Sequence, residues 1–342
     1  MEYSTVRLRE VFFLLNSDWN EEKKELMMEL QAQGICCRSI DKIEELLVQK
    51  SVRDSRKKNV SGNRDSQKEI LLITDDQSAA ARCKGKIVCI GCDREGVSFF
   101  EGAELVTDRL EMLDGQVLEE TLCHVHGYPV TIAETERLII REIAKSDFEG
   151  LRAMSGQDGM QHAFAEFAGE AACDAGMFDP ERLAAYISQV YRFYGYGLWS
   201  VLKKDGTLIG CCGLAEFEKQ MCVDKSGTEC EAARRADKTG AEHGTTESAE
   251  ADVGYAKEAT NTCLELQYML AAEFQGQGYA QEMCRAALRY AAWRTDWDKV
   301  WIRVHKSNEK SQRLAKRLGF SMCGDENGEI IFYVMEIAGD AF

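Results

Sequence analysis

The stretch Leu264-Glu265-Leu266-Gln267-Tyr268-Met269-Leu270, followed four residues later by Gln275-Gly276-Gln277-Gly278-Tyr279-Ala280, decides the fold of the second half of the chain. The first part has the apolar content of a strand, the two glycines mark a turn, and an amphipathic helix is predicted from Tyr279 to about Arg294. Glycine lets backbone N–H groups face outward without a Cβ in the way, and a helix N-terminus adds a partial positive charge. Such a turn suits a diphosphate held by backbone atoms, although two glycines at this spacing also occur in a connection that is merely tight.

Length and charge limit the classes of protein to which the chain can belong. Its 342 residues favour two domains of about 100–200 residues each. The 58 acidic and 42 basic residues give a net charge of -16. A field of this sign repels phosphate backbones and anionic lipid surfaces, so we expect no nucleic-acid and no membrane partner. No window holds the ~20 apolar residues of a membrane span, and the 14 cysteines lie mostly in apolar runs, which is typical of reduced thiols in a cytoplasmic protein.

Residues 1–130 alternate apolar strand segments with helical segments. The segments 11–15, 70–73 and 87–90 are continuous apolar runs. Fully apolar strands that alternate with helices predict a buried parallel sheet, here a small Rossmann-like α/β layer. Residues 51–68 are polar and basic with almost no large apolar side chain, so we expect a mobile loop in that segment.

Residues 131–342 form the second predicted domain, which has the pattern of an α+β fold. Two strand-like segments, 198–202 and 208–217, flank the turn Lys204-Asp205-Gly206 and predict an antiparallel hairpin. Residues 224–262 contain only two large apolar side chains, Val253 and Tyr255, and this composition predicts a disordered insertion. Further strands are expected at 138–140, 264–270, 300–304 and 330–337, and a last helix at 309–318.

Five motifs in order carry a family resemblance over residues 131–342. They are Thr135-Glu136-Arg137-Leu138, Gly210-x-x-Gly213-Leu214, Gln275-x-x-Gly278-x-Ala280, Asn308-x-x-Ser311 and Leu318-Gly319-Phe320. The third is similar to the acyl-CoA-binding signature of the GNAT acetyltransferase superfamily, and the flanking motifs resemble its ribosomal-protein alanine acetyltransferase branch. The resemblance implies a GNAT fold with a mixed, largely antiparallel sheet.

The same resemblance implies acetyl-CoA as the co-substrate and direct acetyl transfer to a primary amine in a ternary complex. By motif position the CoA diphosphate lies on the backbone of the glycine turn, and pantetheine lies where the preceding strand parts from the strand at 300–304. Asn308 contacts the pantetheine arm, caps the last helix, or does both. The residues assigned to acetyl-CoA in this way are Met269, Leu270, Gln275, Gly276, Gln277, Gly278, Tyr279, Ala280, Asn308 and Ser311.

Attack of an amine on a thioester needs a neutral amine, a donor for the carbonyl oxygen and a proton for the departing thiolate. Glu265 stands on the strand where many members of the superfamily carry a carboxylate, so it is the candidate catalytic base; the alternative is an exposed strand carboxylate without a role. The backbone N–H of Met269 or Leu270, freed by a strand bulge, is the candidate oxyanion donor. The segment 309–318 lacks the tyrosine that many members use as general acid, which leaves Ser311 or water to protonate the thiolate.

The acceptor amine is not identified by any motif. A protein N-terminus and a small amine are both consistent with the resemblance, and the negative net charge favours a cationic acceptor through electrostatic steering. Acceptor contacts are expected from the helical region between residues 146 and 196, with Phe164, Glu166 and Tyr186 as candidates. Because the helix tyrosine is missing, a non-catalytic acyl-CoA or metabolite sensor remains the alternative function.

The first domain has a weaker resemblance of its own. The segment 70–76, Ile-Leu-Leu-Ile-Thr-Asp-Asp, and the segment 85–91 after it resemble the last motif region of haloacid dehalogenase-like hydrolases. The nucleophile of that family is the first aspartate of Asp-x-Asp-x-Thr, a motif that this chain does not contain. Asp75 and Asp76 are therefore a vestigial Mg²⁺ site or, more simply, caps of the next helix. We expect a degenerate, non-catalytic domain whose closely spaced Cys89 and Cys92 are core thiols and hold no metal.

Overall fold

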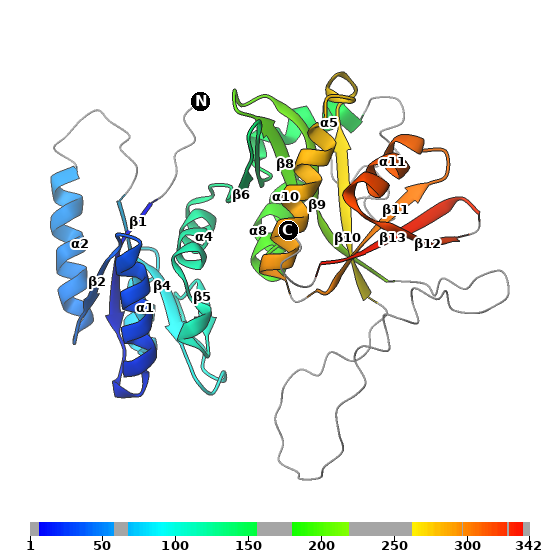
Figure 1. Ribbon diagram of the computed structural model, residues 1–342. Helices are drawn as coiled ribbons and strands as arrows, with labels where there is room; N and C mark the ends of the chain where they lie inside the picture. Colours follow the sequence, from blue (N-terminus) through cyan, green and yellow to red (C-terminus); the bar gives the residue numbers. More distant parts are fainter. Residues whose placement is uncertain are drawn as a thin grey trace, which may run out of the picture. The chain divides into compact units, whose positions relative to one another are not determined.

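The computed structural model describes residues 7–57, 68–155, 180–218, 262–295, 297–326 and 328–337. The chain divides into two compact units, residues 1–130 and residues 131–342 (Figure 1), and each is described by itself. Among the residues that the structure describes, no helix combines the length and the apolar character needed to cross a membrane.

The first unit is a five-stranded parallel sheet with helices on both faces. Its strands lie in the order β2-β1-β3-β4-β5, so the predicted parallel sheet is confirmed. This order is the flavodoxin-like doubly wound arrangement and differs from the Rossmann order 3-2-1-4-5-6. The strands are β1 (Arg7–Leu14), β2 (Cys36–Ser39), β3 (Lys68–Thr74), β4 (Val88–Cys92) and β5 (Leu105–Thr107).

Alternation along β1 explains why both faces of this sheet are covered. Val11 and Phe13 point to one face, where α1 (Asn20–Ala32) and α4 (Gly115–His126) pack, and Phe12 points to the other, where α2 (Ile43–Lys57) and α3 (Gln77–Cys83) pack. The expected loop at 51–68 is wrong at both ends, because α2 continues to Lys57 and β3 already begins at Lys68. Its remaining part, 58–67, lies outside the described residues.

The second unit is built on an eight-stranded mixed sheet in the order β12-β13-β11-β10-β9-β8-β7-β6. All neighbouring strands are antiparallel except β10 and β11, which are parallel. The mixed, largely antiparallel sheet expected from the sequence is therefore confirmed. The strands are β6 (Thr131–Glu134), β7 (Leu138–Glu142), β8 (Leu198–Lys203), β9 (Leu208–Glu218), β10 (Thr262–Leu270), β11 (Lys299–His305), β12 (Ser321–Glu326) and β13 (Ile330–Glu336).

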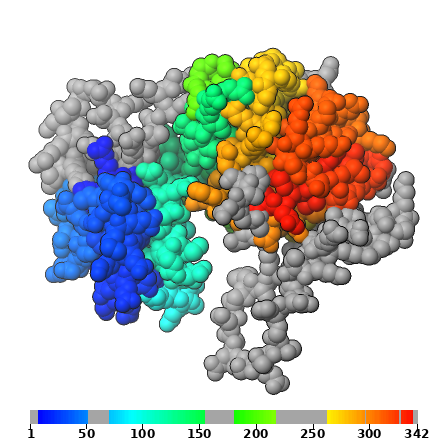
Figure 2. Space-filling view, in the orientation of Figure 1, coloured from blue at the N-terminus to red at the C-terminus, as the bar shows by residue number. Residues whose placement is uncertain are grey.

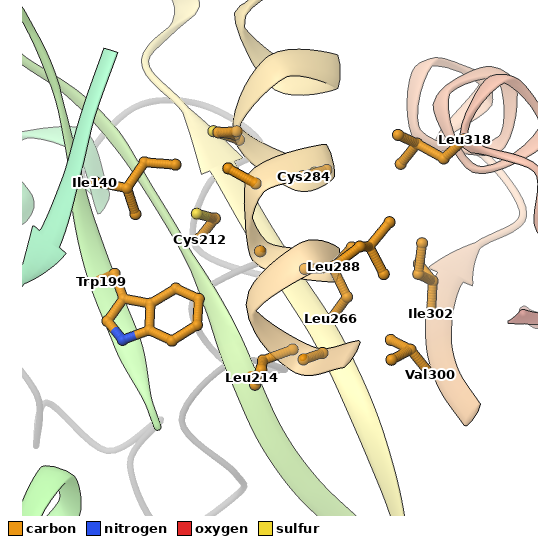
Figure 3. Packing of buried hydrophobic residues seen from close by; sticks show 14 of the residues in the cluster. Ile140, Trp199, Cys212, Leu214, Leu266, Cys284, Leu288, Val300, Ile302 and Leu318 are labelled. Carbon is orange, nitrogen blue, oxygen red and sulfur yellow. The ribbon is translucent and has the colours of Figure 1, made fainter. Parts of the chain in front are cut away.

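Helices cover both faces of this sheet as well. Two helices, α10 (Tyr279–Arg294) and α11 (Glu309–Leu318), have the bounds that their sequence spacing predicts. Leu288 of α10 packs with Trp199, Leu266 and Ile302 in the main core of the unit (Figure 3). On the other face, α5 (Phe148–Ser155) and α8 (Pro180–Tyr194) contribute apolar side chains to a second cluster around Cys211 and Met269. The predicted insertion at 224–262 lies outside the described residues, apart from Thr262 at the start of β10.

A buried ion pair holds the start of the α5 region against the sheet. Arg141 of β7 and Asp147 of the 3-10 turn η3 (Lys145–Asp147) are 3% and 6% exposed, and their side chains form two bonds of 2.7 and 2.8 Å. The Asp147 carboxylate also accepts from the Ser200 hydroxyl at 2.7 Å and from the Ala144 N–H at 2.9 Å. Because these four bonds converge on one carboxylate, they fix this corner of the unit.

Candidate active site

The site is built where two parallel strands separate. β10 and β11 pair only at Leu264 with Val300 and at Glu265 with Trp301. Beyond these residues β10 stays paired with β9 as far as Leu270, and β11 stays paired with β13 as far as His305. The two strands therefore form a fork (Figure 1), and we use this name for the space between residues 266–270 and 302–305.

The hydrogen-bond pattern shows which backbone groups face the fork. The Ala271 N–H donates to Ile209 O at 2.9 Å, so residues of β10 at odd positions bond to β9. The N–H groups of Tyr268 and Leu270 consequently face away from β9, toward the fork. The register from Thr262 to Leu270 is continuous, so the bulge expected in this strand is not there. Of the two candidate oxyanion donors, Leu270 faces the fork and the N–H of Met269 is directed at β9.

The glycine turn leads from β10 into α10. Gly276 and Gly278 have φ angles of +77° and +85°, which other residues rarely adopt. Gly278 is the N-cap of α10 and has no side chain that could bond to the N–H groups of the first turn; the Glu282 N–H donates to Gly278 O at 3.2 Å. The N–H groups of residues 279–281 precede this bond and have no acceptor within the helix. A row of outward N–H groups at the positive end of a 16-residue helix is thus in place for an anion.

Gln275 bridges the end of β10 and the first turn of α11. Its Nε2 donates to Leu270 O at 3.1 Å, and its Oε1 accepts from Lys310 Nζ, on α11, at 3.0 Å. Gln277 is held within the turn, because its Nε2 donates to Glu273 O at 2.8 Å. Lys310 is thereby placed beside the turn as a cation that the sequence motifs did not single out.

The start of α11 borders the fork from the β11 side. Asn308 caps this helix, since its side chain accepts from the Ser311 N–H at 3.1 Å, which confirms the capping alternative for Asn308. Ser311 is half-buried. Its neighbour is the Tyr268 side chain. The Tyr268 hydroxyl is fully buried, and it makes no hydrogen bond of good geometry with the described residues. Burial raises the pKa of Tyr268 above its usual range, and an interaction with Ser311 opposes the rise.

Glu265 is buried and already paired. It is 4% exposed, and Arg303 of β11 donates to it through Nε at 2.7 Å and through Nη2 at 2.8 Å. The Gln267 side chain donates to the same carboxylate at 2.8 Å. Side chains alternate along β10, so Glu265 lies on the sheet face opposite α10, together with Met269. The interpretation of an exposed strand carboxylate does not hold, and a direct base here would have to work inside an ion pair.

The candidate acceptor residues fall in two groups. Phe164 and Glu166 lie outside the described residues. Tyr186 lies on α8, where its hydroxyl accepts from the Leu198 N–H at 2.7 Å and its ring stacks edge-on against Tyr191. The Tyr191 hydroxyl in turn accepts from the Ile143 N–H at 3.0 Å. Both hydroxyls fasten α8 to the sheet.

In the first unit, the two acidic side chains after β3 accept hydrogen bonds from backbone N–H groups. Asp76 caps α3, accepting from the N–H groups of Ser78 and Ala79 at 2.8 and 3.2 Å, which confirms the capping interpretation for Asp76 but not for Asp75. Asp75 accepts from the Asn16 N–H at 3.1 Å. Cys89 and Cys92 are both buried in β4, where burial raises the pKa of Cys92 to about 12. Within the described ranges, no group of three or more metal-ligating side chains comes together.

A family model describes the region around the fork. Residues 224–321 match the model of an acetyltransferase (GNAT) domain, a stretch that includes β10, the glycine turn, α10, β11 and α11. The second unit therefore carries a GNAT acetyltransferase domain. The protein is an acetyl-CoA-dependent N-acetyltransferase.

Solved structures of acetyltransferases also align with the chain. An acetyltransferase from Agrobacterium tumefaciens is 18% identical over 59% of this chain and 92% of its own, with a TM-score of 0.37. A spermidine N-acetyltransferase chimera from Vibrio cholerae is 17% identical over 58% and 95%, with a TM-score of 0.36. The ribosomal-protein acetyltransferase RimL in complex with coenzyme A is 15% identical over 60% and 98%, with a TM-score of 0.36. Likenesses at these TM-scores assign no role to any residue of this chain.

Proposed function

We propose that the second unit transfers the acetyl group of acetyl-CoA to a primary amine by direct attack in a ternary complex. The observation that carries the proposal is the fork between β10 and β11, which opens directly beside an uncapped helix N-terminus. One feature suits an extended pantetheine arm with two amides, and the other suits the diphosphate at its end. Their adjacency fits the shape of a single CoA molecule.

In this proposal the diphosphate lies on the N–H groups of residues 278–281, where the signature Gln275 to Ala280 leads into α10. The pantetheine amides meet the backbone groups of Tyr268 and Leu270 along the open edge of β10. Asn308 and Ser311 border the arm from α11. Gln275, which bridges Leu270 and Lys310, closes the far side of the turn.

The chemistry follows from these placements. The neutral amine attacks the thioester carbon, the carbonyl electrons move to the oxygen, and the C–S bond then breaks to release CoA thiolate. The Leu270 N–H is the donor for the oxyanion, because it faces the fork. The attacking nitrogen gives up its surplus proton to water, and the thiolate takes a proton from water or from the Ser311 hydroxyl, which then recovers one from water. The buried Tyr268 hydroxyl next to Ser311 is a second candidate donor.

Removal of the ammonium proton is the role that we assign to Glu265, acting through a water molecule. Because Arg303 already holds this carboxylate with two bonds, direct proton uptake would weaken the ion pair. A hydrogen-bonded water can pass the proton on while the carboxylate keeps its partner. The pair lies on the sheet face opposite α10, so the acceptor amine approaches from that side.

The acceptor is proposed to be a protein N-terminus or a small amine of positive charge. The net charge of -16 favours the approach of cations. Phe164 and Glu166 remain candidate contacts. An acceptor contact from Tyr186 would use the ring edge, because its hydroxyl is bonded to Leu198. The free cysteines of the described residues fit a reducing compartment, and we propose the cytoplasm.

The test combines binding with turnover. CoA should raise the unfolding temperature, since a ligand that binds only the native state stabilises it by about 2.7 kcal/mol at 100 times its Kd. Acetyl transfer should then be measured over a library of amines and peptide N-termini by mass spectrometry. A shift with CoA but no acetylated product in the whole library would favour the acyl-CoA sensor, and no shift at millimolar CoA would refute the site itself.

For the first unit we propose a non-catalytic docking or regulatory role. The first unit resembles haloacid dehalogenase-like hydrolases but lacks the nucleophile motif of that family, and Asp76 serves as a helix cap. Mg²⁺-dependent hydrolysis of a generic phosphate ester by the full chain would contradict this proposal.

A further inference from the structure

One arginine joins the beginning of the second unit to the glycine turn. Arg137 lies in the connection between β6 and β7, and its Nη1 donates to Gln277 O at 3.0 Å. Its guanidinium carbon lies 4.3 Å from the centre of the Tyr279 ring, and a Cβ at Gly278 would lie 3.4 Å from its Nη2. Figure 2 shows green atoms of the second unit next to its yellow and orange atoms.

The first turn of α10 contains a carboxylate whose negative charge, if uncompensated, would repel a bound anion. Glu282 accepts from the Thr135 hydroxyl at 2.6 Å, from the Arg137 N–H at 3.1 Å and from Arg137 Nε at 2.7 Å, and Arg137 Nη2 is 2.6 Å away. Burial by itself would raise the pKa of Glu282, but the bonds from Thr135 and Arg137 outweigh it, and the pKa is lowered. Glu282 is therefore ionised at neutral pH, one turn from the diphosphate position.

Arg137 acts on the turn in two ways. Its charge cancels that of Glu282, so the field at the helix N-terminus stays positive. Its bond to Gln277 O also fixes the peptide between Gln277 and Gly278. Because the C=O and N–H of a trans peptide point in opposite directions, the Gly278 N–H is turned away from Arg137, toward the outer side of the turn.

We propose that Arg137 makes the glycine turn competent for the CoA diphosphate by neutralising Glu282 and orienting the 277–278 peptide. The inference rests on the proposed function of that turn. Arg137 is a positioning residue, because it contacts the turn and the helix rather than the reacting atoms. CoA binding depends on Arg137 mainly because the charge of Glu282 would otherwise repel the diphosphate.

The experiment measures CoA affinity by calorimetry and kinetics with two thioesters. We expect Arg137→Ala to raise the Kd of CoA roughly 10- to 30-fold, the size expected when an uncompensated carboxylate stands near two phosphate charges at a partly solvated site. Adding Glu282→Gln to this variant should recover most of the loss. Glu282→Gln alone should lower the Kd, because the charge of Arg137 is then uncompensated while Arg137 still holds the Gln277 carbonyl. Arg313→Ala, which removes an exposed pair with Glu309 on α11, is the matched control.

Acetyl-pantetheine, which lacks the diphosphate and the nucleotide, separates this role from a purely structural one. Turnover of acetyl-pantetheine should be the same in the wild type and in Arg137→Ala, whereas the KM for acetyl-CoA rises and kcat is kept. Equal losses with both thioesters, or a double variant no better than Arg137→Ala, would overturn the inference. Failure of the wild type to bind CoA would instead overturn the proposed function, so the two failures are distinguishable.

Discussion

Replacing Glu265 by glutamine tests whether the buried carboxylate takes part in catalysis or only holds two strands together. Glutamine keeps the size of the side chain and can still accept one bond from Arg303, but it cannot take a proton from the amine. The change removes the negative charge of Glu265 from beside Arg303, and the Arg303 side chain is 29% exposed, so water reaches it. We expect a loss of about 2 kcal/mol in unfolding free energy, below the ~3–5 kcal/mol of a fully buried pair.

The same variant should lose activity by more than its stability explains. We expect kcat to fall about 100-fold at saturating acetyl-CoA, at the lower end of the effect of removing a general base. The Kd of CoA should stay unchanged, because Glu265 lies on the face of the sheet opposite α10. Urea denaturation, steady-state kinetics and calorimetry give the three quantities on one preparation.

Arg303→Gln is the matched variant that breaks the ion pair from the other side. It leaves the Glu265 carboxylate in place and lets the new amide donate to it, so most of the activity should remain although stability falls. If Glu265→Gln and Arg303→Gln lowered kcat by the same factor, the ion pair would be only a structural link between β10 and β11. The assignment of Glu265 as the base would then be refuted.

Four further changes test the rest of the site. Tyr268→Phe should lower kcat without raising the Kd of CoA or lowering the unfolding temperature, because the hydroxyl has no full hydrogen bond to lose; an unchanged kcat would exclude it as a proton donor. Gly278→Ala, at φ +85°, should cost about 1–2 kcal/mol in stability and weaken CoA binding; unchanged affinity would contradict the role of the turn. Lys310→Ala should raise the Kd of CoA a few-fold at low salt and less at high salt, unlike Arg313→Ala. The pKa of Glu282 is lower in the folded state than in the unfolded chain, so ionised Glu282 stabilises the fold above the ordinary carboxyl range. This stabilisation is lost as the pH falls through the lowered pKa. In thermal unfolding, Glu282→Gln should therefore lose less stability at acid pH than the wild type does.

The sequence was a good guide wherever local spacing decides the structure. The bounds of α10 and α11 follow from helical periodicity, and each helix adjoins a glycine with a positive φ, Gly278 before α10 and Gly319 after α11. It was a poor guide to the end of α2, because residues 51–57 are polar and basic in sequence and this composition predicted a loop. The candidate oxyanion donor Leu270 was identified by motif position, but the expected bulge was wrong.

By itself, then, the sequence determined the two-part alternation of strands and helices, the glycine turn with its helix, and the motif that points to acetyl-CoA. Tertiary structure alone decided that Glu265 is paired with Arg303, 38 residues away, and that Glu282 is paired with Arg137, 145 residues away. It also decided the fork, because β10 and β11 pair at only two positions. Helix and turn signals act over a few residues, whereas strand register and ion pairing depend on packing between distant segments, which no local pattern records.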